Sequence, residues 1–489
     1  MSRVVPIDAR SRKSPPEPEP LPRGVALDTD LANAHRLARV YGDSARFVHQ
    51  MSYWHLWDSS RWQRDETGEV ERKAHQIGRG LEVHGADLLA HAAALEDEEA
   101  RKRFQSLAQR YLRWAQRSQT AKSVDATLRM ARVFQEFSVT PDQLDRDPLL
   151  LACPNGTVDL ATGQLRDARQ EDLITKRSHV AYDRDALCPT WHAFLRRIFV
   201  DDALIGYVRR ACGYSLTGCT QEQCLFVLHG EGANGKSVLL ETIRFVVGDY
   251  GQTTPTATLM DSQKSEHRND VARLAGARFV TASESAEGKR FDEELVKRIT
   301  GGDKMAARFL RREHFEFTPV LKLWIATNHK PEVRGVDLGI WRRLKLIPFT
   351  VTIPSDEQDP QLVDKLKAEA PGILAWCVQG CLEWQRTGLQ APEAVASATH
   401  EWRKEANQVA QFVDERCVTG DPEYVRTKTA DLYAAYRDWA RESGNEQLSQ
   451  TAFGKRLDPL GFKSDRKSGA RVWCGLAVSP SNDNRGGDT

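Results

Sequence analysis

The chain has 489 residues, and its 69 lysines and arginines nearly balance its 68 aspartates and glutamates, which leaves a formal net charge of +1. A chain of this length is expected to form about three or four domains, and a hydrophobic fraction of 40% predicts packed cores. The charge balance excludes a wholly basic nucleic-acid coat protein and an acidic disordered chain, although single domains can still carry basic patches.

No apolar run approaches the ~20 residues that a membrane-spanning helix needs, and the N-terminus carries no apolar signal-peptide core. The nine cysteines are scattered and form no C-x-x-C pair, which argues against a structural zinc site. Such cysteine usage suits a reducing compartment. We therefore expect a cytoplasmic protein with no membrane partner.

The first part of the chain is expected to be helical. Residues 1–24 are rich in proline and predict a disordered leader, and residues 25–215 predict a helix-rich N-terminal region. Asn155-Gly156 and Thr162-Gly163 predict small β-hairpins near 149–165. Two further groups of apolar residues are expected to pack in cores, namely the tryptophans at 54, 57 and 62 and a helical stripe of Phe104, Leu107, Tyr111 and Trp114.

The strongest local pattern is an apolar run over 224–228 that leads into G-x-x-x-x-G-K-S and then into a helical sequence. Glycines let the backbone form a cradle of N–H groups around phosphates, and the helix N-terminus adds partial positive charge. Lys236 is expected to reach the β- and γ-phosphates, and the Ser237 hydroxyl to hold Mg²⁺. The predicted ATP-binding residues are Gly230, Gly232, Ala233, Asn234, Gly235, Lys236, Ser237 and Val238.

ATP hydrolysis also needs groups that act on water, metal and γ-phosphate. A predicted strand over 277–283 ends at Glu284, our candidate to polarise the attacking water and to join Ser237 as a metal ligand. Ser283 stands where an aspartate usually precedes this acid. This leaves open whether a protein carboxylate or Ser237 together with water holds most of the metal. A third apolar strand ends at Asn328, a candidate γ-phosphate sensor.

Arg342 and Arg343 follow this sensor and are candidates for arginine fingers that act on a neighbouring subunit's nucleotide. The sequence does not choose between them, and a surface arginine pair is the simpler alternative.

Taken together, these motifs resemble superfamily 3 helicases, specifically the helicase half of the phage, plasmid and poxvirus primase–helicase family. The similarity is carried by residues 154–163, 230–237, 279–284, 297–308, 324–331 and 339–343. It implies an α/β fold: a P-loop, AAA+-like ATPase core with a mainly parallel sheet over 216–415, including a helical follow-on, beside a helical N-terminal domain. It further implies a hexameric ring that hydrolyses ATP to move along DNA, typically 3′→5′, with the 297–308 segment forming a channel hairpin.

Two basic segments are candidates for DNA binding. The channel segment offers Lys304, Arg308, Arg311 and Arg312, with Gly301-Gly302 allowing a tight turn. Residues 416–478 are expected to form a winged helix, followed by a disordered tail over 479–489. Between 449 and 473 this module has six basic and two acidic residues, and its candidate DNA contacts are Lys455, Arg456, Lys463, Arg466, Lys467 and Arg471. A solvated hairpin and a protein-docking winged helix are the alternatives.

The leading hypothesis is an ATP-dependent DNA helicase of a phage, prophage or plasmid replication system. Asp28 and Asp30 form a D-x-D at the edge of the leader, ahead of a helical pattern, so we expect no primase domain and a separate primase or polymerase partner. An ATP-gated DNA-binding initiator or maintenance factor that does not unwind is the second hypothesis. A metabolic P-loop kinase is the third, and the basic segments argue against it.

Overall fold

A computed structural model describes residues 20–261, 268–283, 290–308, 314–333, 338–444, 447–467 and 470–479. It divides into two compact units. The first holds the described residues up to Val158 together with Leu165–Arg177, and the second holds Asp159–Gln164 and the described residues from Ser178 onward. None of the helices in these ranges is both long and apolar enough to cross a membrane.

The first unit contains a four-stranded sheet in the order β3-β2-β1-β4. Its central strand β1 pairs antiparallel with β2 and parallel with β4, so that Phe47 lies opposite Ser138. The strands are β1 (Ala45–Val48), β2 (Tyr53–Trp57), β3 (Trp62–Arg64) and β4 (Ser138–Val139). The sequence predicted a helix-rich region here and did not anticipate this sheet. Trp54 and Trp62 are buried, as core packing requires, and Trp57 is half-buried.

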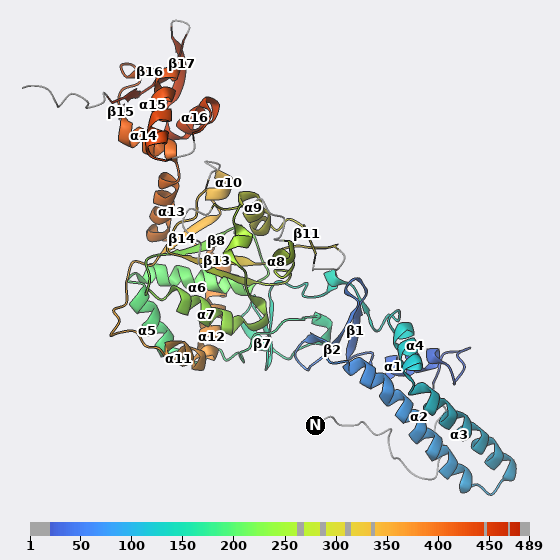
Figure 1. Ribbon diagram of the computed structural model, residues 1–489. Helices are drawn as coiled ribbons and strands as arrows, with labels where there is room; N and C mark the ends of the chain where they lie inside the picture. The colour runs from blue at the N-terminus through green and yellow to red at the C-terminus, as the bar shows by residue number, and fades with distance from the viewer. Residues whose placement is uncertain are drawn as a thin grey trace, which may run out of the picture. The chain divides into compact units, whose positions relative to one another are not determined.

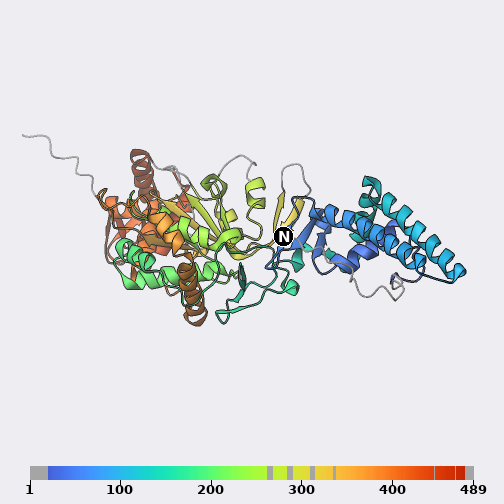
Figure 2. The same cartoon turned by 90° about the horizontal axis from the view of Figure 1, so that it is seen from below.

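Helices cover one face of this sheet and extend away from it. Phe47 and Trp54 of the sheet pack in one cluster with Leu37, Ile77 and Leu128. The helices are α1 (Asp30–Tyr41), α2 (Glu69–Ala93), α3 (Glu98–Ser118) and α4 (Ala121–Ala131). Helices α2 and α3 lie side by side as a long hairpin (Figures 1 and 2). Of the predicted stripe, Tyr111 and Trp114 are buried between them, and Leu107 lies at the exposed edge.

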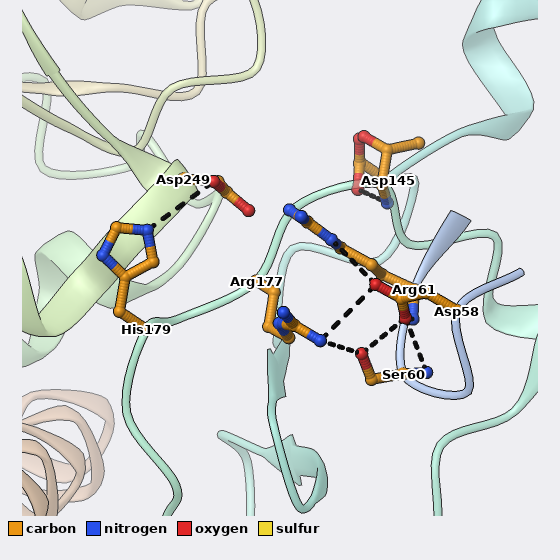
Figure 3. Close-up of polar contacts among 8 residues, drawn as sticks. Asp58, Ser60, Arg61, Asp145, Arg177, His179 and Asp249 are labelled. Atoms are coloured by element: carbon orange, nitrogen blue, oxygen red, sulfur yellow. Dashed lines mark hydrogen bonds and ion pairs between the residues drawn. The ribbon is translucent and has the colours of Figure 1, made fainter. Parts of the chain in front are cut away.

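A polar network holds the turn between β2 and β3 to the end of the first unit (Figure 3). Asp58 accepts hydrogen bonds from Ser60 and from the Arg61 backbone N–H, at 2.7–2.9 Å. Arg177 Nη1 donates to Ser60 Oγ at 2.6 Å and lies 3.4 Å from Asp58 Oδ2. Burial raises the pKa of Asp58, but the hydrogen bonds from Ser60 and Arg61 outweigh it and hold the pKa below its usual value. The network therefore holds Arg177, the last residue of the first unit, in place; the second unit continues from Ser178.

The hairpins predicted near 149–165 are present as a three-stranded sheet in the order β5-β6-β7. The strands are β5 (Leu150–Cys153), β6 (Gly156–Asp159) and β7 (Gln164–Arg166). The turn between β6 and β7 clusters with the second unit. There it is bonded by Tyr182 Oη to the Gly163 carbonyl and by Gln385 Nε2 to the Leu160 carbonyl.

The second unit is built on a five-stranded, wholly parallel sheet in the order β14-β8-β13-β10-β9. This confirms the predicted α/β class with a mainly parallel sheet. Apolar residues fill both faces of β8 and β13, as parallel sheets require. The strands are β8 (Leu225–His229), β9 (Gly251–Thr253), β10 (Phe279–Ser283), β13 (Lys322–Thr327) and β14 (Leu344–Pro348).

Helices pack on both faces of this sheet (Figure 1). On one face the ring centroids of Phe226 and Trp324 lie 4.3 Å apart, and Trp324 Nε1 donates to Ser215 of α6. The helices on this side are α5 (Pro189–Ile198), α6 (Asp202–Leu216), α7 (Lys236–Val247), α11 (Leu362–Ala368) and α12 (Ala370–Thr387). On the other side lie α8 (Arg268–Ala272), α9 (Glu293–Gly301), α10 (Leu338–Trp341) and α13 (Glu393–Glu405). Helices α5 and α6 thus belong to the second unit, although the sequence grouped them with the N-terminal region.

Two buried cations tie the amino edge of the sheet to the end of α6. Arg278 Nη1 donates to the Leu216 carbonyl at 2.8 Å, and Lys322 Nζ donates to the carbonyls of Thr217 and Cys219. The Leu216 and Thr217 carbonyls lie at the negative end of the α6 dipole, where positive groups are favourable. Burial lowers the pKa of Lys322 to about 7.

The C-terminal module has its own core around Phe412, Tyr436, Trp439, Phe453 and Trp473. The helix and hairpin predicted near 449–473 are present as α16, β17 and β18, and β18 lies between β16 and β17. The elements are α14 (Gln408–Arg416), β15 (Cys417–Thr419), β16 (Arg426–Lys428), α15 (Thr429–Glu442), α16 (Gln450–Leu457), β17 (Lys463–Lys467), β18 (Ala470–Cys474) and β19 (Leu476–Val478).

Candidate nucleotide site

The glycine loop, residues 230–237, joins the carboxyl end of β8 to the start of α7. Gly235 adopts a left-handed φ of +86°, and a Cβ there would lie 2.7 Å from Ile198 Cγ2. At Gly230 a Cβ would lie 2.1 Å from the Phe349 carbonyl oxygen. Ala233 is also left-handed, at +55°, and its carbonyl is held by the Ile353 N–H at 2.8 Å. Neighbouring strands and helices therefore impose the loop's shape.

Lys236 stands at the first turn of α7 and is 6% exposed. Its Nζ donates to the Gly230 carbonyl at 2.5 Å, to the Glu231 carbonyl at 3.2 Å and to Asn328 Oδ1 at 3.1 Å. Burial lowers its pKa. The ammonium group is therefore held inside the loop by three oxygens, which are the same kind of acceptor that a phosphate offers.

Asn328 follows directly after β13, the strand between β8 and β10. Thr327 fixes the bend beyond it, because its Oγ1 donates to the His329 carbonyl at 2.6 Å and accepts from the His329 N–H. Two residues that the sequence placed 92 positions apart are thus in direct contact. His229, at the end of β8, is a neighbour that the motif search missed. Burial and the charges of Lys330 and Lys236 lower its pKa.

Glu284 lies outside the described residues, which end on this strand at Ser283. Ser237 is exposed on the first turn of α7, next to Lys236. Among the described residues no group of three or more histidine, cysteine or carboxylate side chains could hold a metal ion.

The two candidate finger arginines differ sharply. Arg343 is 8% exposed, and its Nε donates to Thr300 Oγ1 at 3.1 Å and its Nη1 to the Gly339 carbonyl at 2.5 Å. Arg342 is exposed and contacts Gln223 at 3.0 Å. Arg343 therefore supports the fold of its own chain, and Arg342 is the exposed member of the pair.

The predicted channel segment is partly helical. Residues 297–301 lie on α9, which ends at Gly302 with φ of +74°, and the hairpin begins only afterwards. Strands β11 (Met305–Arg308) and β12 (His314–Phe317) pair antiparallel. Lys304 and Arg308 are exposed on this hairpin. Arg311 and Arg312 lie outside the described residues.

In the C-terminal module, α16 and the β17–β18 hairpin carry the predicted basic residues. Lys455, Lys463, Arg466 and Arg471 are exposed and Arg456 is half-buried. The Lys467 side chain lies outside the described set. Arg466 and Arg471 stand directly opposite each other on the hairpin, an arrangement of like charges that an anion between them would stabilise.

Three family models match the chain. Residues 34–200 match a model described as D5 N terminal like, residues 228–343 match a family of unknown function, and residues 404–473 match a model described as poxvirus D5 protein-like. The chain belongs to the D5-type primase–helicase family, in its helicase part. The two models that flank residues 228–343 are thus both described as D5-like.

Curated relatives of this D5-type chain are proteins of large DNA viruses. A protein named putative helicase L207/L206 of Acanthamoeba polyphaga mimivirus is 28% identical over 324 residues, which is 61% of this chain and 34% of the relative. Putative helicase 022R of Frog virus 3 is 24% identical over 69% of this chain and 43% of the relative. Putative primase C962R of African swine fever virus is 21% identical over 60% of this chain and 34% of the relative. The chain spans about a third to two-fifths of these relatives' length.

Among solved structures, the A form apo structure of the NrS-1 C terminal region is similar with a TM-score of 0.45 and 10% identity. It covers 92% of this chain and all of that one.

Proposed function

We propose that the chain is an ATP-dependent DNA helicase of superfamily 3 type, with an AAA+-like P-loop core, which works in phage, prophage or plasmid DNA replication. The observation that carries the proposal is the contact between Lys236 Nζ and Asn328 Oδ1 at 3.1 Å. It joins a phosphate-loop lysine to a polar residue at the carboxyl edge of a parallel sheet, where α/β proteins bind nucleotides.

On ATP binding, Lys236 exchanges the Gly230 and Glu231 carbonyls for the β- and γ-phosphate oxygens. Asn328 is then released to hold the γ-phosphate and the attacking water. Ser237 and Glu284 are the residues that would hold Mg²⁺, which supplies charge neutralisation at the phosphates when bound. Glu284 would accept the proton of the water. Arg342 would act on the nucleotide of a neighbouring subunit in a hexameric ring.

DNA binding is proposed for the β11–β12 hairpin and for the C-terminal module as a winged helix, because both expose basic side chains. A separate primase or polymerase is the proposed partner. Asp28 and Asp30 support no priming role, since Asp28 is paired with Arg110 at 2.6 Å and Asp30 accepts from Ser123. Primer synthesis that is lost in a variant with both aspartates changed to alanine would contradict this.

The test is ATP hydrolysis and fork unwinding with 3′- and 5′-tailed DNA. Lys236→Ala should abolish both. Lys304→Ala should abolish strand displacement while most ATP hydrolysis remains, and Lys365→Ala, an exposed lysine of α11, is the matched control that should change neither. ATP-dependent DNA binding without displacement on either fork would refute the motor and favour the non-unwinding initiator.

A further inference from the structure

The outer side of α3 forms a basic surface that no part of the proposed mechanism uses. Residues 100–124 contain seven lysines and arginines and no aspartate or glutamate. Six of the seven are on α3. Arg101 is half-buried and donates to the Leu95 carbonyl. The other five define the basic stripe: Lys102, Arg103, Arg110, Arg113 and Arg117. A segment with this charge in a protein of net charge +1 stands out from its surroundings.

Helix geometry brings these five residues onto one side. At 100° per residue they fall within a sector of about 100°. The opposite side carries Ala108, Tyr111 and Ala115, which are buried against α2. All members of the basic stripe are exposed, and both ribbon views show α3 as one side of the projecting hairpin (Figures 1 and 2).

Little of this charge is neutralised within the protein. Lys102 pairs with Glu98 at 2.7 Å, but both side chains are more than 70% exposed, so the pair is weak. Arg110 pairs with Asp28. Within the described part of the chain, Arg103, Arg113 and Arg117 form no ion pair with a carboxylate, although the charge of Arg113 helps to lower the pKa of Asp28. Three guanidinium groups are therefore available to an external anion.

We propose that the basic stripe of α3 binds the sugar–phosphate backbone of DNA without reading its sequence. The inference rests on the proposed function, because it adds a DNA surface to a chain proposed to act on DNA. From Arg103 to Arg117 the helix rises about 21 Å, which matches about six phosphates of one strand at 3.4 Å each.

The neighbours of the stripe favour nucleic acid over an acidic protein. Between the basic residues stand Ser106, Gln109 and Gln116, which are exposed hydrogen-bond donors. The stripe carries no exposed aromatic side chain, and Leu107, 36% exposed, lies at its border. Protein interfaces depend on buried aromatic and apolar anchors, whereas phosphate contacts depend on charge and donors.

The experiment uses the full chain with Arg103, Arg113 and Arg117 all changed to glutamine. The affinity for labelled single-stranded and duplex DNA of mixed sequence is measured over a series of salt concentrations. We expect weaker binding, and a slope of log affinity against log salt that is lower by about 2–3 for duplex DNA. ATP hydrolysis without DNA should be unchanged. The matched control changes three exposed arginines elsewhere: Arg79, Arg129 and Arg386.

An unchanged salt slope in the stripe variant, with DNA binding intact, overturns the inference and leaves the helicase proposal standing. Equal losses in the stripe and control variants also overturn it, because they show an effect of net charge alone. If the unchanged chain binds no DNA at all, the inference fails together with the proposed DNA motor. ATP hydrolysis that depends on Lys236 would then still identify the nucleotide site.

Discussion

His55 on β2 is a buried histidine between two arginines. It pairs across the sheet with Arg46 of β1 and Arg64 of β3, and it is 5% exposed. Burial, reinforced by Arg64 and opposed by Asp145, lowers its pKa to about 4. Among the described residues its Nδ1 has no hydrogen-bond partner. The folded first unit therefore keeps this imidazole neutral well into the acidic range.

The stability of the first unit should depend on this histidine below neutral pH. In the unfolded chain the imidazole titrates near its ordinary value, so between pH 6.5 and 4 the unfolded state binds a proton that the folded state refuses. Stability should fall across that window by up to about 3 kcal/mol. Urea unfolding of His55→Leu should show a weaker loss between neutral and acidic pH than the unchanged chain, whereas His75→Leu, at an exposed position of α2, should not. Identical pH dependence in the His55 variant would contradict the assignment.

The sequence could predict where Lys236 and Asn328 stand relative to their strands, because both positions follow fixed local rules. Lys236 belongs to a spacing that requires a strand, a turn and a helix start, and Asn328 ends an apolar run. The difference between Arg342 and Arg343 was not readable. It depends on the partners that the fold brings to Arg343, namely Thr300 and Gly339, and adjacent residues give no hint of those partners.

At the scale of elements, the contact between α6 and α12 depends on backbone approach. A Cβ at Gly213 of α6 would lie 2.0 Å from the Cys381 backbone nitrogen of α12. Gly206, on the same helix, faces only the end of the Arg210 side chain, at 3.5 Å. Since both positions are helical, a change to alanine has the same propensity effect at each and differs only in steric cost.

Gly213→Ala should therefore destabilise the second unit by several kcal/mol, because neither helix backbone can move without disturbing the sheet beneath. Gly206→Ala should stabilise it by about 0.5–1 kcal/mol through helix propensity. Urea unfolding of the two variants measures the difference. Equal stabilities would show that the two helices do not need the close approach.

The elements differ in how well the sequence predicts them. Strands β8, β10 and β13 are apolar runs because both of their faces are buried, and their predicted positions are confirmed. The sheet of the first unit gave no such signal. Strands β3 and β4 have three and two residues, and the parallel pairing of Phe47 with Ser138 joins segments far apart in the chain. Such a pairing is set by tertiary packing and not by local pattern.

At the scale of the whole molecule, the chain passes between its two units three times, after Val158, Gln164 and Arg177. The boundary expected near residue 215 would cut off α5 and α6, and so uncover the face of the sheet that holds Phe226 and Trp324. The near-neutral total charge is also explained at this scale, because basic surfaces on α3, the β11–β12 hairpin and the C-terminal module are offset by acids elsewhere. Local basic surfaces suit the proposed DNA motor, which would bind DNA and release it again.

The proposed ring makes a prediction that only the assembled molecule can test. If Arg342 acts on a neighbour's nucleotide, each site takes Lys236 from one subunit and Arg342 from the next. Lys236→Ala and Arg342→Ala then each remove one of these two contributions. Each variant alone should be inactive in DNA-stimulated ATP hydrolysis. A one-to-one mixture should recover activity, because about a quarter of the interfaces then combine an intact Lys236 with an intact Arg342 from the next subunit.

The matched control is a mixture of Lys236→Ala with Asn328→Ala. These two residues touch within one subunit, at 3.1 Å, so no interface of the mixed ring contains an intact pair. This mixture should stay inactive. Recovery in both mixtures would show that the gain in activity does not depend on a site shared between subunits. Recovery in neither would place Arg342 outside the reaction or in its own subunit's site. Recovery in the Arg342 mixture alone requires that the nucleotide be shared between two copies of the chain.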